Sequence, residues 1–476
     1  MTTKPIPEDF PDWIDDDLAD LLPDLDLVHD LWDGLRHGSI KKYIPKEQKE
    51  PLTAYEVRVS LTQLDNLFTP TITGYSGLLS NFRVTEITAQ SIVDNFANFD
   101  GQGNDLTVFL TDGDNAVLRD GCCAYLVDFP DTSQLDLSTP LKLKAANLFP
   151  YVSLINRRNI LNPKSFIENG KKVIESFVLR TSIAVPVGRF GQTFKTIYKL
   201  FERGSDRNGG NCIMTAFEIV EDKGTRSLLQ IGDVKEFPSR KEIPIVFYST
   251  NDRDPLKAIP PFLNTARLNI QLLRKQSQLD ELLRKINMPV GVISDDDTYD
   301  IGPTGERVYK EIYIGCNTVI HTSSKGKFYF AEPTGAAMAS TRDDINSLLK
   351  SMDRVSLSFL GGSKEGAMTA TEALLNTAQV TTTISGIARR KESVVQSLFE
   401  LWCSFTGEKS VGGITIDDSV IKPIMTDAGA QQLINSIGGL SPQLTLSILK
   451  ERWYDFNVDD EIARRSQTDA NVGANP

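Results

Sequence analysis

The sequence has few of the residues that form disulfides, metal centres and catalytic triads. Three histidines (His29, His37 and His321) lie far apart, and no H-E-x-x-H motif occurs. None of the five cysteines has C-x-x-C spacing, so we expect reduced, mostly buried thiols at Cys122, Cys123, Cys212, Cys316 and Cys403. We therefore predict no metal, no cofactor and no catalytic residue, and expect that the protein is not an enzyme.

Long apolar runs are also missing. No stretch reaches the roughly eighteen apolar residues of a membrane span, and the N-terminus is acidic where a secretory signal would be basic and then apolar. We expect no contact with a membrane. The chain of 476 residues is nevertheless 40% hydrophobic, which is ample for the cores of about two to four domains.

Basic residues are outnumbered, with 51 Lys and Arg against 63 Asp and Glu and a net charge of -12. Tight DNA binding depends on cations that neutralise phosphates, so this balance argues against it. The acids concentrate in residues 8–33, EDFPDWIDDDLADLLPDLDLVHDLWD. This pattern favours a solvated acidic helix with one apolar face, and an arm that docks a partner is the alternative.

A glycine-rich stretch, LGGSKEGAMTATEALLNT at residues 360–377, invites comparison with a phosphate-binding loop. A Walker-type loop needs Lys and then Ser or Thr after its second glycine, but Lys364 precedes Gly366 and no apolar strand leads into Gly361. Nucleotide binding is therefore disfavoured. An ordinary flexible connection between two helices remains open.

Three consecutive acids, Asp295, Asp296 and Asp297, raise the alternative of a metal-dependent nucleotide hydrolase or nuclease. Consecutive residues seldom converge on one ion, and these lie in a segment typical of a soluble turn. We therefore rank this alternative low.

The order of helical and strand patterns indicates an α+β protein. Helix-like spacing covers most of the first 120 residues, and the pair Asp120-Gly121 predicts a hairpin turn before a buried strand over 122–129. Residues 151–248 alternate in the manner of an antiparallel sheet. A helix without a breaker follows over 260–287, and its cations favour a solvated face over a phosphate-facing one: Arg267, Arg274, Lys275, Arg284 and Lys285.

A compact β-like insert is predicted over 288–339, and another helix follows it. Thr341 is the expected N-cap, and the apolar stripe of that helix comprises Ile345, Leu348, Met352, Val355 and Phe359. From residue 370 to 405, apolar positions recur in steps of three and four, which predicts a long helix packed along its length, either within the chain or against another subunit. Thr377 and Lys391 depart from this seam, which includes Val380, Ile384, Ile387, Val394, Leu398 and Leu401.

This order of elements resembles the portal proteins of tailed bacteriophages. The resemblance is carried by GCCAYLVDFP, YVSLINRRNILN, the long stretch from IPIVFYS to NMPVGVI, and GGLSPQLTLSILKERWYDFNVDDEIAR. These stretches are similar to a portal subfamily catalogued as a phage domain of unknown function. The resemblance extends over nearly the whole chain, although none of these stretches is a chemical signature.

The resemblance implies a portal-like division of the chain. Residues 1–259 would form the acidic arm and a helical and β-stranded wing, 260–287 the first stem helix, 288–339 the clip, and 340–360 the second stem helix. Residues 361–368 would be a tunnel loop, 369–426 the spine helix with a wing strand, and 427–476 a helical C-terminal crown.

The same resemblance implies a ring, typically a dodecamer, at one capsid vertex of the virion, assembled in the host cytoplasm. Double-stranded DNA would pass through it non-specifically during packaging and ejection, with terminase large subunit, head–tail adaptor, major capsid and scaffolding proteins as partners. The residues facing DNA would be Gly361, Gly362, Ser363, Lys364, Glu365, Gly366 and Thr369. An oligomeric scaffold or adaptor that translocates nothing is the alternative.

Overall fold

The computed structural model describes residues 10–416 except 37, 86–88, 131–147, 206–208, 223–224, 252, 287–289, 295–298, 302, 310–325, 332–335, 354–369 and 410–411. The chain divides into two compact units. The larger unit comprises 1–29, 70–263 and 357–476, and the helical unit comprises 30–69 and 264–356. Among the described residues, no helix combines the length and apolarity needed to cross a membrane.

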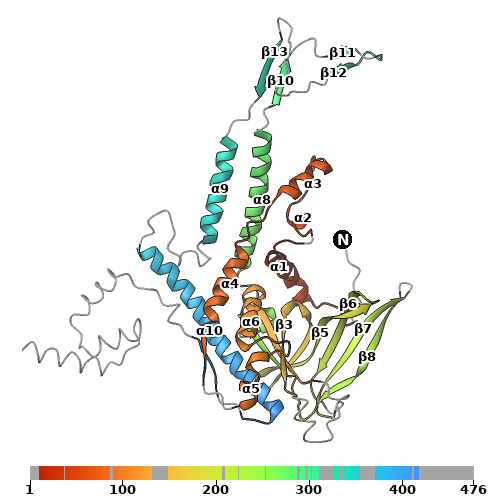
Figure 1. The fold of residues 1–476 in the computed structure, drawn as a ribbon, viewed down its shortest axis with the longest axis vertical. Coiled ribbons are helices and arrows are strands. Elements are labelled where there is room, and N and C mark those ends of the chain that lie inside the picture. Colours follow the sequence, from red (N-terminus) through yellow and green to blue (C-terminus); the bar gives the residue numbers. More distant parts are fainter. Residues whose placement is uncertain are drawn as a thin grey trace, which may run out of the picture. The chain divides into compact units, whose positions relative to one another are not determined.

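The fold is a mixture of helices and antiparallel strands, as the sequence predicts (Figure 1). The helices are α1 (Asp16–Trp32), α2 (Ile40–Tyr43), α3 (Leu52–Leu61), α4 (Phe68–Leu79), α5 (Gln90–Asp94), α6 (Leu106–Asp120), α8 (Leu263–Ile286), α9 (Ala336–Asp353) and α10 (Ala370–Thr406). The strands of the larger unit are β1 (Phe82–Thr85), β2 (Cys122–Asp128), β3 (Tyr151–Asn156), β4 (Ile160–Glu168), β5 (Lys171–Val187), β6 (Gly191–Glu202), β7 (Cys212–Asp222), β8 (Thr225–Phe237), β9 (Ile245–Ser249) and β14 (Gly413–Ile416). Those of the helical unit are β10 (Val290–Ser294), β11 (Tyr299–Ile301), β12 (Arg307–Tyr309) and β13 (Lys327–Ala331).

A three-stranded antiparallel sheet, in the order β3-β2-β9, lies at the centre of the larger unit. Helices α6 and α10 both contact it. The hairpin predicted at Asp120-Gly121 is wrong, because α6 runs through Asp120 and Gly121 caps it in the left-handed region with φ of 82°. A Cβ at Gly121 would lie 2.6 Å from the carbonyl oxygen of Ile259, so both conformation and space require glycine here.

A five-stranded antiparallel meander, β4 to β8 in chain order, forms the second sheet and confirms the β-rich region predicted over 151–248. Strand side chains alternate between its two faces, so each face packs against a different layer. One face joins the small sheet in a cluster of buried residues: Ala124, Leu126, Ile155, Ile160, Phe177, Leu179, Phe201, Cys212, Phe237 and Ile243.

The opposite face of the meander carries α1. Leu18, Leu21 and Leu25 of α1 pack against Leu161 and Val178. The predicted acidic helix with one apolar face is therefore confirmed, and that face lies against the sheet rather than in solvent. The larger unit is layered as helices, small sheet, large sheet and α1.

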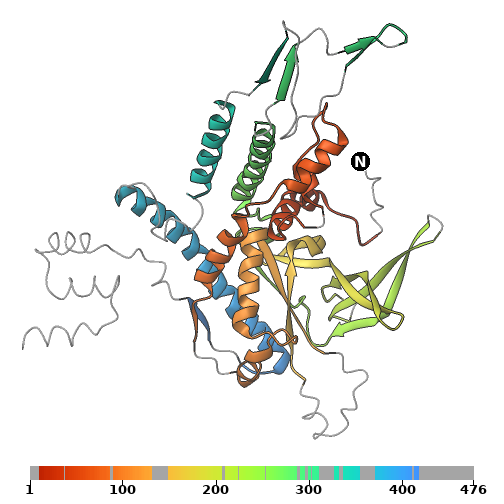
Figure 2. The same cartoon turned by 45° about the horizontal axis from the view of Figure 1, so that its top comes forward.

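The helical unit contains α2, α3, α8, α9 and the four short strands (Figure 2). Helix α8 matches the helix predicted over 260–287. The second helix begins earlier than predicted, so Thr341 lies inside α9 and is not its N-cap. The preceding residues, Ala336 to Ala339, are strong helix formers and extend the helix backward. Val355 and Phe359 of the predicted stripe lie outside the described residues.

Candidate functional site: the helix pair, its β insert and two polar clusters

The helix pair α8 and α9 is joined by the β insert. Strand β10 follows α8 closely, β13 precedes α9, and the two strands pair antiparallel with Val290 opposite Ala331. This pairing brings the end of α8 and the start of α9 together, and Figure 2 shows the two helices side by side. A hairpin, β11 with β12, lies between these two strands in the chain. The insert is thus a small β module carried on the ends of two helices.

The cations predicted along α8 have different surroundings. The Arg274 Nε donates a hydrogen bond to the Tyr43 carbonyl oxygen at 2.8 Å, and Lys275 pairs with Asp344 of α9 at 2.8 Å. Arg267 and Arg284 are exposed, and the side chain of Lys285 lies outside the described residues. Arg274 and Lys275 therefore hold elements of the helical unit together.

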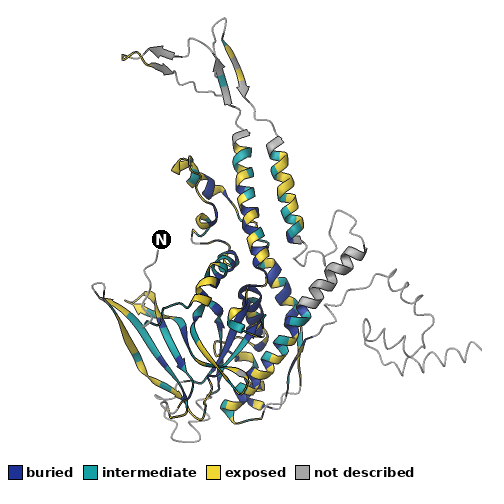
Figure 3. Cartoon of the chain, turned by 180° about the vertical axis from the view of Figure 1, so that it is seen from behind, coloured by how far each residue is buried: buried dark blue, intermediate teal, exposed yellow. Residues whose placement is uncertain are grey.

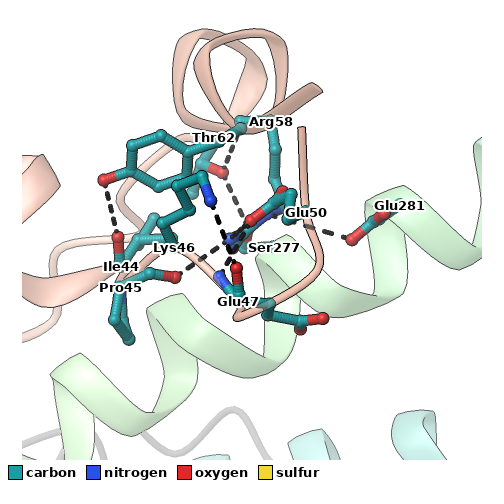
Figure 4. A network of polar contacts seen from close by, with 10 residues as sticks. Ile44, Pro45, Lys46, Glu47, Glu50, Arg58, Thr62, Ser277 and Glu281 are labelled. Atoms are coloured by element: carbon teal, nitrogen blue, oxygen red, sulfur yellow. Dashed lines mark hydrogen bonds and ion pairs between the residues drawn. The ribbon is translucent and has the colours of Figure 1, made fainter. Parts of the chain in front are cut away.

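A cluster around Arg58 anchors α3 to α8 (Figure 4). The Arg58 guanidinium donates from Nε and Nη2 to the two carboxylate oxygens of Glu50, each at 2.8 Å, and from Nη2 to the Pro45 carbonyl at 3.0 Å. Glu281 of α8 lies 3.9 Å from Arg58 Nε. The hydrogen bond from Arg58 lowers the pKa of Glu50 to about 2, and the pKa of Arg58 is raised in turn. This set is called the Arg58 cluster below.

Two further polar residues of α8 hold the segment between α3 and α4. The buried hydroxyl of Thr62 donates to Ser277 Oγ at 2.9 Å. Asn269 Oδ1 accepts hydrogen bonds from the backbone N–H groups of Leu67 and Phe68, both at 3.0 Å, and so caps the start of α4. Asn269 and Ser277 are fully or almost fully buried polar residues on α8. The sequence analysis missed them, although polar residues among apolar helix positions were the available signal.

The seam predicted along α10 is buried at some of its positions and half-buried at others. Ile384, Ile387 and Leu398 are buried as predicted, but Val394 and Leu401 are only half-buried. The side chain of Val380 lies outside the described residues. The buried positions instead continue through Val395, Phe399, Trp402 and Cys403. The buried seam keeps the 3.5-residue repeat but takes the next residue along at 388, 395 and 402: Ile384, Ala388, Lys391, Val395, Leu398 and Trp402.

The contacts of α10 decide between the two roles left open for its described part. The helix contacts α5, β2, β9 and β14, all in the larger unit. Trp402 stacks on Phe99 with ring centroids 4.9 Å apart. From residue 384 onward, α10 is an intrachain spine.

Lys391, which departs from the apolar seam, is 1% exposed and has three neighbours. Its Nζ donates to Asp114 Oδ2 at 2.6 Å and to the Leu79 carbonyl oxygen at 2.9 Å, and it lies 4.8 Å from the Phe82 ring centroid. Tyr248 donates to the other Asp114 oxygen at 3.0 Å. Burial raises the pKa of Asp114 to about 6, against the opposing effects of Lys391 and Tyr248. This Lys391 cluster ties α10, α6 and β9 together.

The acidic arm is paired with the unit on which it packs. Asp12 pairs with Arg226, Asp17 with Lys257 at 2.6 Å, and Asp26 with Arg158 at 2.8 Å. His29 Nε2 lies 3.0 Å from Asp120, which also accepts hydrogen bonds from Arg119. These pairs favour a structural role for the arm over a partner-docking one.

Two predicted sites cannot be placed. The glycine-rich loop, including Lys364 and Thr369, lies outside the described residues, as do Asp295, Asp296 and Asp297. Within the described residues, no group of His, Cys, Asp and Glu is arranged to hold a metal ion. The four described cysteines are buried and form no disulfide, as predicted, and burial raises the thiol pKa of Cys122 and Cys212 to about 12.

Comparison with known proteins gives limited matches. A family model described as Domain of unknown function (DUF4055) matches residues 261–406, from the start of α8 to the end of α10. No curated protein matches the sequence. Among solved structures, a chain in the virion of a native gene transfer agent (GTA) particle is 11% identical, with 89% of this chain and 98% of that chain covered and a TM-score of 0.41. A chain in the neck of an empty GTA particle computed with C6 symmetry is 10% identical, with 84% and 92% covered and a TM-score of 0.40. Such a loose likeness does not establish a shared function.

Proposed function

We propose that the protein is a portal: a ring-forming conduit at one capsid vertex, through which double-stranded DNA passes during packaging and ejection. The observation that carries the proposal is the helix pair α8 and α9, which presents a small β module between two long helices. That order, followed by a glycine-rich loop and the long α10, is the order on which the resemblance to portal proteins rests.

The charge balance suits a conduit better than a DNA-binding protein. A ring multiplies every charge by its number of subunits, so a few cations per chain facing the lumen would bind phosphates strongly enough to slow transport. The net charge of -12 and the neighbouring pair Lys364 and Glu365 avoid this. Hydrogen bonds from Ser363 and Thr369 to phosphate oxygens would carry no sequence information. A channel for a whole genome requires contact of this weak, non-specific kind.

The β insert is the proposed docking site for terminase and later for the head–tail adaptor. Its strands form two short antiparallel pairs beyond the ends of the two helices. The larger unit is the proposed contact with capsid protein. No catalytic residue is proposed for any of these surfaces.

Native mass spectrometry of the purified chain, with negative-stain images of the same sample, tests this function. Closed rings of about a dozen subunits with a central hole are expected, since a closed heterologous contact generates rings. A chain that stays monomeric alone and forms no ring when coexpressed with its capsid protein would contradict the proposal. Oligomers without a hole would favour a scaffold or adaptor.

The glycine-rich loop gives a separate prediction. Lys364→Glu should leave ring formation unchanged and reduce the DNA packaged or retained per particle, because it replaces the loop cation near passing phosphates with a second anion. Ser410→Ala, at a small polar residue outside the loop, is the matched control. Normal packaging by Lys364→Glu would remove the loop from the proposed DNA path.

A further inference from the structure

Arg157 is a buried cation without a counter-ion in the described part of the chain. It is 1% exposed and forms no ion pair with a described residue. Each of the other buried cations described pairs with a carboxylate at 2.6–2.8 Å: Arg58, Arg119 and Lys391. Arginine is rarely buried this far unless it is paired, because removing a charge from water is costly. Arg157 is thus the described buried cation whose charge no contact matches.

The guanidinium of Arg157 has hydrogen-bonding capacity left over. Its Nε donates to the carbonyl oxygen of Leu256 at 2.8 Å, and its Nη1 donates to that of Ile160 at 2.9 Å. No described residue accepts a hydrogen bond from Nη2. The two bonds that are made fix the orientation of the guanidinium, and they leave the planar edge that includes Nη2 for an anion.

Arg157 lines a cavity of about 870 Å³ in the larger unit, called the β9 cavity below. Its apolar lining includes Ile174, Ile243, Ile245, Phe247 and Leu256. Leu256 also accepts the bond from Arg157, so apolar surface adjoins the guanidinium. Figure 3 shows burial decreasing from the small sheet toward the outer meander, and the lining likewise ranges from buried Ile243 to exposed Ser165. The volume falls in the range of about 300–1,000 Å³ typical of small-ligand pockets.

The charges around the β9 cavity are balanced in number, so they do not favour a ligand of high charge. The carboxylates are Asp15, Asp17, Glu242 and Asp254, and the other cations are Lys172, Arg253 and Lys257. Lys172 pairs with Asp254 at 2.9 Å, and Lys257 pairs with Asp17 at 2.6 Å. All of these residues are exposed or half-buried, which leaves Arg157 as the buried charge of the lining. An anion with one negative charge fits this balance better than one with two or more.

Burial has the largest effect on the pKa of Arg157 and lowers it from its ordinary value of 12.5. Asp15, Asp17 and Asp254 raise the pKa from a distance, but they do not offset the loss of water. The carboxylates of the lining therefore compensate the guanidinium only in part. An anion in direct contact with Arg157 would complete the compensation, since the interaction of two charges weakens as their separation grows.

We propose that the β9 cavity binds a small organic monocarboxylate, with the carboxylate on Arg157 and an apolar body against Ile174 and Leu256. The planar guanidinium matches a carboxylate, and charge-assisted hydrogen bonds of this kind are about twice as strong as neutral ones. The apolar lining favours an aliphatic or aromatic body. Inorganic phosphate would bring more negative charge toward the lining carboxylates and no apolar group, so it should bind weakly. The site goes beyond the proposed function and does not depend on ring formation.

Hexanoate is a suitable probe, because it joins one carboxylate to an apolar chain. Ligand-detected NMR titration of the full chain compares it with 1-hexanol, which has the same chain length and no charge, and with inorganic phosphate. Hexanoate should bind saturably, and 1-hexanol should bind at least about tenfold more weakly, as expected for loss of a charged hydrogen bond. Phosphate should not displace hexanoate at equal concentration.

Arg157→Lys tests the anchor. It keeps a positive charge and removes the planar fork, so hexanoate affinity should fall at least about tenfold while 1-hexanol affinity stays unchanged. Arg253→Lys is the matched control, because Arg253 is an exposed arginine of the same lining. Its hexanoate affinity should stay within about twofold of that of the unsubstituted protein, since exposed charges interact weakly.

Methyl NMR locates the site in the unsubstituted protein and so does not depend on how well a variant folds. With isoleucine methyl groups labelled, hexanoate should shift the signals of Ile174, Ile243 and Ile245, which line the cavity. Ile183 lies on β5 with Ile174, is 41% exposed and is outside the lining, so its signal should not move.

The outcomes separate this inference from the proposed function. Equal binding of hexanoate and 1-hexanol, or equal hexanoate affinity in Arg157→Lys and the unsubstituted protein, would overturn the role of Arg157. Methyl shifts confined to isoleucines outside the cavity would overturn the site, and displacement of hexanoate by phosphate would overturn the ligand class. Rings that form without hexanoate binding would leave the proposed function standing, and hexanoate binding by a chain that forms no ring would leave this inference standing alone.

Discussion

The Lys391 cluster of the larger unit and the Arg58 cluster of the helical unit both pair a cation with a carboxylate, yet they shift the carboxyl pKa in opposite directions. Asp114 is enclosed on all sides, so loss of solvent dominates and raises its pKa to about 6. The Glu50 side chain is only 9% exposed, but the hydrogen bond from Arg58 outweighs the effect of burial and lowers its pKa to about 2. The comparison shows how the surroundings of an ion pair, rather than its members, set its energetic effect.

The two units also differ in how many apolar side chains they bury. The larger unit buries apolar clusters on both faces of its meander. In α9, by contrast, Met352 is the only buried residue among the described side chains, and Ile345 and Leu348 of the predicted stripe are half-buried. Polar contacts such as Lys275 with Asp344 hold this unit where apolar contacts are few. Among the described residues, apolar packing is therefore denser in the larger unit than around α9.

Breaking the enclosed pair should have the largest effect. Asp114→Ala leaves the Lys391 ammonium buried without its carboxylate, and loss of one member of a buried pair costs about 3–5 kcal/mol. Urea unfolding measures the loss. Asp112→Ala, at an exposed residue of the same helix, should change the free energy of unfolding by about 0.5 kcal/mol or less. A loss below about 1 kcal/mol for Asp114→Ala would contradict enclosure of the pair.

A glycine substitution tests how tightly the larger unit is packed. Gly121→Ala combines a left-handed backbone with a Cβ 2.6 Å from the Ile259 carbonyl oxygen, and we expect a destabilisation of about 2 kcal/mol. Gly170→Ala has a similar φ of 78° but no atom within 4 Å of the added carbon, so its cost should be about half as large. Thermal unfolding compares them, and equal losses would mean that the close approach at Gly121 is easily relaxed.

The Arg58 cluster should act locally. Arg58→Met removes the charged hydrogen bonds that hold α3, and amide exchange in α3 should accelerate on the order of tenfold, while exchange in α6 stays unchanged. Hydrogen exchange followed by mass spectrometry resolves the two helices. Lys46→Met, beside the cluster, is the control. Faster exchange in both α3 and α6 would show that the cluster supports more than the helical unit.

The smallest expected effect concerns the pH dependence of stability, to which the two clusters should contribute in opposite directions. Glu50 has a lowered folded-state pKa, so its contribution is complete above its ordinary value of 4.5 and is lost as the pH falls toward about 2. Asp114 has a raised pKa, so stability from this group falls as the pH rises from its ordinary 3.8 through about 6. Unfolding curves across this range, compared with Glu50→Gln and Asp114→Asn, should show each slope flattened by its own variant. If both variants kept the slope of stability against pH of the unsubstituted protein, the assignment of the two pKa shifts to Glu50 and Asp114 would be contradicted.

Much of the secondary structure follows from local sequence. Periodicity and the prolines at 260 and 261 predict α8 to within a few residues at each end, because apolar residues recur at the helical period along an uninterrupted helix. The predicted start of α9 is wrong, since a Thr followed by two acids has the pattern of an N-cap whether or not helix-forming residues precede it. The predicted hairpin at Asp120-Gly121 is wrong for a similar reason, because an Asp-Gly pair can end a helix as well as form a hairpin turn.

The sequence by itself determined the α+β class, the long helices, the β insert and the absence of any local metal or nucleotide motif, because these depend on residues close together along the chain. Only the tertiary structure decided that Lys391 meets Asp114 and that the acids of the arm pair with Arg158, Arg226 and Lys257. Such contacts join residues far apart in sequence, and their energies depend on burial, which no local pattern specifies.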